Sequence, residues 1–82
     1  MSKNEPTELL VAVHFDNSDR PSIVVSIDGD NKRARFIPRK LILSFHKTGQ
    51  ATLGTDRNGR KVRLPLGNLV IPEWLAIREE LV

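Results

Sequence analysis

Basic side chains are concentrated in the middle of the sequence. Residues 32–63 contain ten lysines and arginines and one acidic residue, a net charge of +9, whereas the whole chain has 13 basic and 10 acidic residues and a net charge of +3. Dense cationic groups bind phosphate backbones by neutralising charge and releasing counterions. The sequence therefore predicts contact with nucleic acid, or with an acidic partner protein, through Lys32, Arg33, Arg35, Arg39, Lys40, Arg57, Arg60, Lys61 and Arg63. The alternative interpretation is that these side chains form ordinary solvated strand faces, where lysine and arginine also protect sheet edges.

Two pairs of these cations alternate with apolar residues. Arg33 and Arg35 fall on one face of an extended segment, and Lys61 and Arg63 fall on one face of a later segment. Because successive side chains of a strand point to opposite faces, all four would form a single patch if the two strands were neighbours. The same alternation assigns Phe36, on the face opposite the arginines, to the core.

Aromatic side chains, on which nucleobases could stack, are few: three phenylalanines, one tryptophan and no tyrosine. Phe36 is assigned to the core, and Phe45 shares a face with Leu41 and Leu43, which is again a core pattern. The sequence therefore favours contact with the nucleic-acid backbone over stacking of bases.

Residue types that could support catalysis or bind a metal are sparse. The chain has no cysteine, which excludes disulfides, thiolate nucleophiles and cysteine-type zinc sites. His14 and His46 lack the spacing of a metal-binding motif, and the Asp-Gly-Asp segment at residues 28–30 is typical of a hairpin turn rather than of a calcium loop. Ser44 and His46 could share a strand face, but no third group orients them. We expect a protein that is not an enzyme and that takes no cofactor and no metal.

Length and composition indicate one small domain. The chain has 82 residues, of which 39% are hydrophobic and 28% charged, ordinary values for a folded protein. A chain of this size buries only about 60 to 65% of the surface that its unfolded form exposes, which leaves little room for a deep catalytic cleft. The polar residues 1–8 are expected to be a flexible N-terminus, and residues 9–82 a single domain. No apolar run suggests a signal peptide or a membrane-spanning helix, so we expect a cytoplasmic protein without membrane contact.

Alternating apolar and polar residues predict a series of short strands. The expected segments are residues 8–15, 22–28, 32–37, 42–47, 51–53, 60–64 and 69–71. In the first of them, Leu9, Val11, Val13 and Phe15 share one face. Turn-forming residues separate the segments, notably at 48–50 and at 54–59, where a hairpin is expected.

The last eleven residues predict a helix over 72–82. Pro72 suits the first helical position, and Trp74, Ile77 and Leu81 follow at spacings that place them on one apolar stripe. A helix this short is marginal alone in water. The three residues are therefore structural anchors that must dock on this domain or on a second copy in a homodimer.

The whole pattern is typical of an all-β fold: a small antiparallel barrel of five to seven strands, SH3-like or OB-like, with one short C-terminal α-helix. The alternative is an open antiparallel sheet with the helix across one face.

Two stretches carry a resemblance to a known group of proteins. Residues 36–42 (Phe-Ile-Pro-Arg-Lys-Leu-Ile) and residues 69–76 (Leu-Val-Ile-Pro-Glu-Trp-Leu-Ala) resemble an Ile-Pro-basic segment and a C-terminal Ile-Pro-x-Trp-Leu-Ala helix start in small uncharacterised bacteriophage and prophage proteins. The resemblance implies a phage origin, a small β-domain and a place in the cytoplasm of a bacterial host. It implies no activity and assigns no functional residues.

Charge pattern and resemblance together lead to two function hypotheses and a simpler third. The first is a non-enzymatic accessory module of phage type that contacts the nucleic-acid backbone through a basic strand face. The second is a protein-binding inhibitor of a host defence or nucleic-acid-processing complex, of the anti-CRISPR or anti-restriction type. The third is an assembly protein whose helix docks on a copy of itself.

Overall fold

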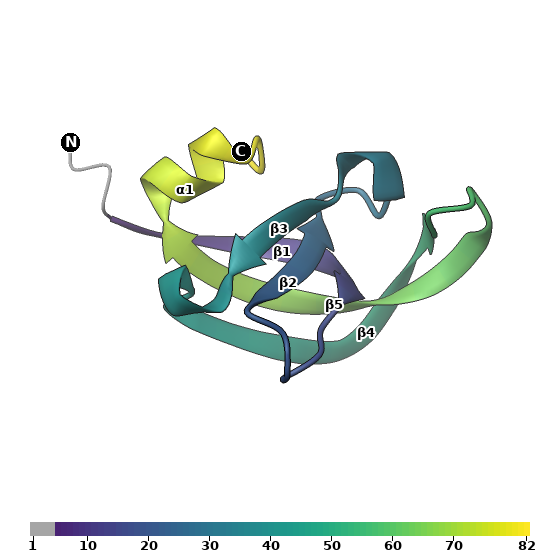
Figure 1. Cartoon of the computed structure of the whole chain (residues 1–82), viewed down its shortest axis with the longest axis horizontal. Helices are drawn as coiled ribbons and strands as arrows, with labels where there is room; N and C mark the ends of the chain where they lie inside the picture. The colour runs from purple at the N-terminus through teal and green to yellow at the C-terminus, as the bar shows by residue number, and fades with distance from the viewer. Residues whose placement is uncertain (1–4) are drawn as a thin grey trace.

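Five antiparallel strands form one sheet, which confirms the all-β prediction. The computed structural model describes residues 5–82 and contains β1 (Pro6–Phe15), β2 (Ser22–Ser26), β3 (Arg35–Pro38), β4 (Ser44–Thr55), β5 (Lys61–Pro72) and a C-terminal α1 (Glu73–Arg78) (Figure 1). Two 3-10 turns, η1 (Asn31–Arg33) and η2 (Arg39–Leu41), flank β3. The strand order is β3-β2-β1-β5-β4. In the part of the chain that the structure describes, no helix is long and apolar enough to cross a membrane.

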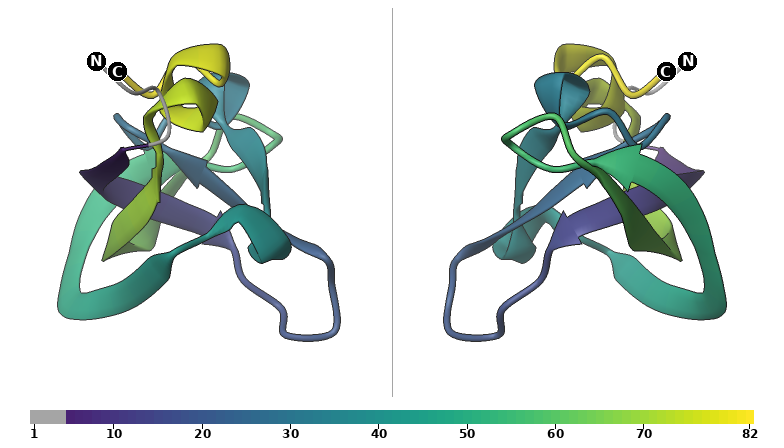
Figure 2. Two further views of the ribbon diagram at one scale, coloured as in Figure 1. Left: turned by 90° about the vertical axis from the view of Figure 1, so that its left-hand side faces the viewer. Right: turned by 90° about the vertical axis from the view of Figure 1, so that its right-hand side faces the viewer.

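The sheet is strongly bent, and its two edge strands, β3 and β4, do not form a ladder with each other in the described chain. Figure 2 shows the long strands β4 and β5 curving away from the plane of the others. Among residues 5–82, β3 and β4 are not paired with each other. Instead, the Thr55 N–H donates to the Gly29 carbonyl over 2.9 Å and the Asn31 N–H donates to Thr55 Oγ1 over 3.0 Å. These bonds tie the connection between β2 and β3 to the end of β4.

One face of the sheet carries the hydrophobic core, and α1 packs over it (Figure 1). The buried aliphatic side chains alternate along the strands, as burial on one face requires. They are joined by three residues of the C-terminal segment, so the core consists of Val11, Val13, Ile23, Val25, Ile37, Leu69, Ile71, Leu75, Ala76 and Leu81. Phe45, Leu41 and Trp74 pack against this cluster from its margin, in agreement with their expected core positions, whereas Leu43 is exposed.

The predicted orientation of the third strand is wrong. Residues 31–33 form the 3-10 turn η1, capped by the Asp30 carboxylate, which accepts the Lys32 N–H over 2.9 Å. In β3, Ile37 pairs with Ile23 and is fully buried, whereas the Phe36 side chain is 70% exposed. The buried Ile37–Ile23 pair decides which face turns inward, and Phe36 must then point outward.

The predicted orientation of Phe15 is also wrong, because β1 has an irregularity at His14. Val13 pairs with Val25, but Phe15 pairs with Val24, so one residue of β1 is inserted between the two pairs. A bulge of this kind shifts the following side chain to the other face of the sheet. Val13 therefore belongs to the core, whereas Phe15 lies on the opposite face and is 45% exposed.

The β4–β5 hairpin is confirmed, but both arms are longer than expected. Residues 48–50 were expected to turn the chain, yet they only interrupt the ladder within β4, where Gly49 takes a φ of +85°. That conformation is easy for glycine because it has no Cβ. Likewise β5 is one strand of 12 residues and not two short segments. The turn between the arms is held by Asp56 Oδ1, which accepts the N–H groups of Asn58 and Arg60.

The C-terminal helix is shorter than the predicted 72–82. Pro72 is its N-cap, and helical structure ends at Arg78. Glu80 then takes a left-handed φ of 58°, the Glu80 N–H donates to the Ile77 carbonyl, and the Leu81 N–H donates to the Ala76 carbonyl over 2.9 Å. This pattern is a Schellman motif.

The Schellman motif changes which side chains of the C-terminal segment are buried. It folds Leu81 back into the core. The expected stripe is therefore only partly correct: Leu81 is buried and Trp74 half-buried, but Ile77 is exposed. Leu75 and Ala76 are the helical residues that fill the core.

The N-terminal boundary also differs from the prediction. Residues 6–8 were expected to be flexible, but they belong to β1 and pair with Ile71 and its neighbours in β5. The Glu73 N–H at the start of α1 donates to the Glu5 carbonyl over 2.9 Å. The remainder of the expected flexible segment, residues 1–4, lies outside the described residues.

Candidate functional site

Four exposed cations occupy the end of the β4–β5 hairpin. Arg57 and Arg60 lie in its turn, and Lys61 and Arg63 lie on the first residues of β5. None of the four forms an ion pair within residues 5–82, and all are exposed. The one acidic side chain among them, Asp56, is engaged by backbone N–H groups of the turn. We call Arg57, Arg60, Lys61 and Arg63 the hairpin cations.

Two further candidate residues lie at the same end of the molecule. The turn η1, which carries Lys32 and Arg33, lies at the hairpin end of the molecule (Figure 1), and the bond between Asn31 and Thr55 joins it to the hairpin. Lys32 is exposed, and Arg33 Nη1 lies 3.7 Å from Asp28 Oδ2. Both members of this pair are largely exposed, and such pairs contribute little. The arginine therefore stays accessible to an anionic partner.

The remaining candidate cations are placed elsewhere. Arg35 Nη2 lies 3.2 Å from Glu80 Oε1, on the side of the sheet where α1 packs. Lys40 is exposed on η2. The single patch expected of Arg33, Arg35, Lys61 and Arg63 required adjacent strands, but β2 and β1 lie between β3 and β5.

Arg39 is held by a set of intramolecular contacts. Its Nη2 lies 2.7 Å from Asp16 Oδ1 and also donates to the Asn17 carbonyl, while its Nε donates to the Arg20 carbonyl over 2.8 Å. The hydrogen bond from Arg39 lowers the pKa of the Asp16 carboxyl below its usual value, and the nearby Lys47 acts in the same direction. Arg39 thus fixes the loop between β1 and β2 and has few donors left for a ligand.

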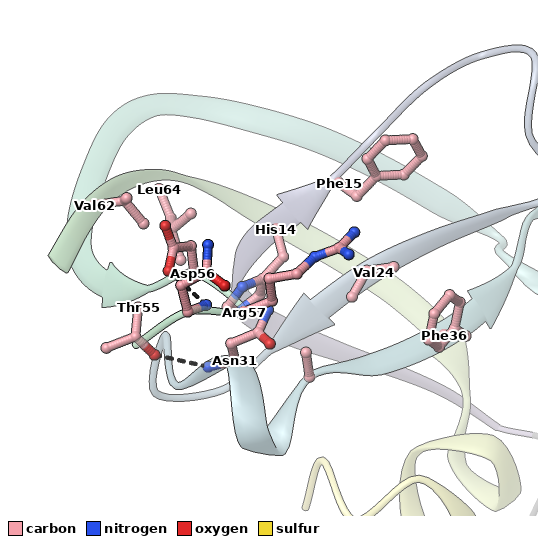
Figure 3. Close-up of a pocket in the computed structure, with 12 residues that line it drawn as sticks. His14, Phe15, Val24, Asn31, Phe36, Thr55, Asp56, Arg57, Val62 and Leu64 are labelled. Carbon is pink, nitrogen blue, oxygen red and sulfur yellow. Dashed lines mark hydrogen bonds between the residues drawn. The ribbon is translucent and has the colours of Figure 1, made fainter. Parts of the chain in front are cut away.

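An open cleft of about 970 Å³ separates the hairpin from the face of the sheet opposite the core (Figure 3). Its floor is a row of side chains across three strands, because Phe15 pairs with Val24 and Val24 pairs with Phe36. The opposite wall comes from the hairpin: Thr55, Asp56, Arg57, Asn58, Val62 and Leu64. Figure 3 shows the Arg57 side chain extending from the turn across the cleft. An apolar floor with two exposed rings and an arginine at its rim suits a ligand with flat apolar groups and negative charge.

His14 lies at the floor of the cleft and contacts a buried polar group. Its Nε2 is 2.7 Å from Ser26 Oγ, which is fully buried and also accepts the Gly29 N–H over 2.8 Å. In the neutral tautomer that carries its proton on Nδ1, the Ser26 hydroxyl donates to Nε2 while its oxygen accepts from Gly29. Burial lowers the pKa of His14, although the charges of Asp28 and Asp30 act against this effect.

Two backbone segments approach each other closely beside the cleft. A Cβ on Gly54 of β4 would overlap the Gly29 carbonyl oxygen and the Leu64 side chain. Gly29 itself has a φ of +86° and is buried. These two glycines allow the end of β4 to lie directly against the connection between β2 and β3, next to Thr55, which lines the cleft.

Sequence reasoning missed the cleft because its residues meet only through strand pairing. Phe36 was assigned to the core and Phe15 to one face with Val11 and Val13, and nothing in their spacing relates the two rings to residues 55–64. Within residues 5–82, no three histidine, aspartate or glutamate side chains are grouped so that they could hold a metal ion.

Comparison of the chain with protein-family models, with curated proteins and with solved structures finds no match.

Proposed function

We propose that the protein is a small non-enzymatic accessory module of phage type that binds nucleic acid, with the hairpin cations contacting the phosphate backbone. The observation that carries this proposal is the group of four exposed cations between residues 57 and 63, which have no ion-pair partner in the described chain. Lys32 and Arg33 extend this group at the same end of the molecule.

Accessible cations bind phosphate at lower cost than cations already engaged. An exposed arginine exchanges only water and counterions for a phosphate, whereas Arg39 would first have to release Asp16. The proposal therefore narrows the nine candidate residues of the sequence to those at the hairpin end. Arg35, Arg39 and Lys40 are expected to contribute less.

The test compares two triple variants of equal charge. One replaces Arg57, Lys61 and Arg63 with serine, and the control replaces Arg20, Lys40 and Arg78, which are exposed outside the hairpin end. Fluorescence anisotropy with a labelled oligonucleotide measures affinity over a range of salt concentrations. The hairpin variant should bind weakly. Its log affinity should also decrease less steeply with log salt, with a slope smaller in magnitude by about three, because three phosphate contacts are lost. The proposal is wrong if the native protein binds no oligonucleotide at low salt, or if the two variants lose affinity equally.

A second function, inhibition of a host defence or nucleic-acid-processing complex, is favoured by one observation. Leu53 pairs directly with Arg63 on the hairpin and is 70% exposed. An apolar side chain among cations is typical of contacts with a protein. A pull-down from host lysate with and without nuclease distinguishes the functions: protein partners retained after nuclease treatment and lost in Leu53→Ser would indicate the inhibitor.

A further inference from the structure

We infer that the cleft between the hairpin and the β1–β2–β3 face holds unpaired nucleobases, so that the protein takes single-stranded rather than double-stranded nucleic acid. This inference rests on the proposed function and names the class of its ligand. The hairpin cations supply contact with phosphate, and the cleft supplies contact with bases.

The floor of the cleft is built for stacking. Phe15 and Phe36 are 45% and 70% exposed, respectively, and Val24 lies between them in register. Neighbouring strands are about 4.8 Å apart, so the two rings rise from backbones about 10 Å apart on the same face. Bases stack on exposed aromatic rings whatever their sequence, because every base has a flat apolar face.

Charge complementarity identifies the occupant. Arg57 extends across the cleft from the hairpin turn (Figure 3). Lys61 and Arg63 alternate with the cleft-lining Val62 and Leu64, so they place further positive charge on the outer face of the same hairpin. A guanidinium can bind a phosphate or lie flat on a base. A ligand that matches both the rings and the cations carries planar apolar groups at regular intervals along an anionic chain. A single strand of nucleic acid has that chemistry.

Polar groups of the cleft could bond to the edges of a base. The side chains of Asn31 and Asn58 line it, each with donor and acceptor atoms in one amide. In a duplex the same base faces are covered by neighbouring pairs, and only the backbone and groove edges are presented. The floor of the cleft would then remain unused.

The experiment compares three probes of equal length and backbone charge per strand: a single strand of mixed sequence, its duplex, and a strand of abasic tetrahydrofuran units. The native protein should bind the single strand at least about 10-fold more tightly than the abasic strand. Phe36→Ala should lower the affinity for the single strand about 5- to 150-fold, which is the range expected for the loss of one stacked ring. Affinity for the abasic strand and the salt dependence should not change.

Two controls separate stacking from loss of structure. Phe36→Trp keeps a flat ring and should retain affinity. Leu10→Ala removes an exposed apolar side chain that does not line the cleft, and should leave affinity unchanged.

Each remaining outcome contradicts either the inference alone or the proposed function as well. Equal affinity for the single strand and the abasic strand, or tighter binding of the duplex, would overturn the inference while the role of the hairpin cations stands. Absence of binding to all three probes would overturn both. A nuclease-resistant protein partner that is lost in Phe36→Ala would assign the cleft to a protein instead.

Discussion

The two faces of the sheet at β1, β2 and β3 differ in what covers them. On one face, aliphatic side chains such as Ile23 and Ile37 are fully buried beneath α1 and the C-terminal residues. On the other face, Phe15, Val24 and Phe36 lie in one row and face an open cleft. Both faces carry apolar side chains, but only those of the first belong to the buried core. The second therefore keeps exposed rings that are available to a ligand.

The largest expected effect concerns the packed face. Leu75 of α1 is 1% exposed and belongs to the core cluster, whereas Ile77 in the same helix is exposed. Leu75→Ala should lower the free energy of unfolding by about 2 to 5 kcal/mol, since it removes buried methyl groups and leaves a cavity. Ile77→Ala is the matched control and should change stability little. Urea unfolding measures both, and similar effects of the two substitutions would contradict the assignment of α1's inward face.

The next effect concerns the junction between the packed region and the cleft. Gly54→Ala would place a methyl group against the Gly29 carbonyl and Leu64. Overpacking of this kind costs about 1 to 3 kcal/mol. Because the hairpin has to move to relieve the overlap, oligonucleotide affinity should fall as well.

Gly49→Ala is the control for Gly54→Ala. Gly49 has positive φ, but nothing lies near the position of its Cβ. Its substitution should lower the melting temperature through backbone strain alone and leave affinity unchanged. Loss of affinity in both variants would show that the Gly54–Gly29 contact has no special role in the cleft.

Part of this organisation follows from the sequence alone. The all-β class, the hairpin around residues 54–59 and a helix beginning near Pro72 could be predicted, because they depend on local alternation and on turn residues. The group of cations at the hairpin end could also be located, because those residues are close in sequence.

The remaining features depend on contacts between distant residues. Phe36 and Ile37 are both apolar, so only the pairing of Ile37 with Ile23 decides which one faces inward. Plain alternation could not predict the bulge at His14, which turns Phe15 to the cleft. The helix ends early because the left-handed Glu80 allows Leu81 to be buried, although the residue at that position is not a glycine.

A smaller effect on stability is expected from a change of pH, through His14 at the floor of the cleft. Burial lowers its pKa in the folded protein, so the unfolded chain binds a proton more readily. Stability should therefore be fully present above the unfolded pKa of about 6.5 and should decline as the pH falls through that value. With Nε2 protonated, the imidazolium donates to Ser26 Oγ, and the Ser26 hydroxyl hydrogen has to turn toward another acceptor.

Urea midpoints measured from about pH 7.5 down to pH 5 test this prediction, since carboxylates such as Asp16 respond mainly at lower pH. His14→Gln should abolish the decrease of the urea midpoint between about pH 7.5 and pH 5. His46→Gln, which changes the exposed histidine of β4, should leave that decrease in place. If the urea midpoint of His14→Gln still falls with pH, another titratable group is responsible for the pH response.

The smallest expected effect on stability is that of Phe36→Ala, and it tests the difference between the two faces directly. Phe36 and Ile37 are consecutive in β3, but the Phe36 ring is 70% exposed, whereas the Ile37 side chain is fully buried. Ile37→Ala should cost about 2 to 5 kcal/mol, whereas Phe36→Ala should stay within about 0.5 kcal/mol, because little of its surface is removed from water on folding. The larger side chain would then matter less for folding than its smaller neighbour. If Phe36→Ala destabilises the protein as much as Ile37→Ala, the ring is part of the core, and the exposed row on which stacking depends does not exist.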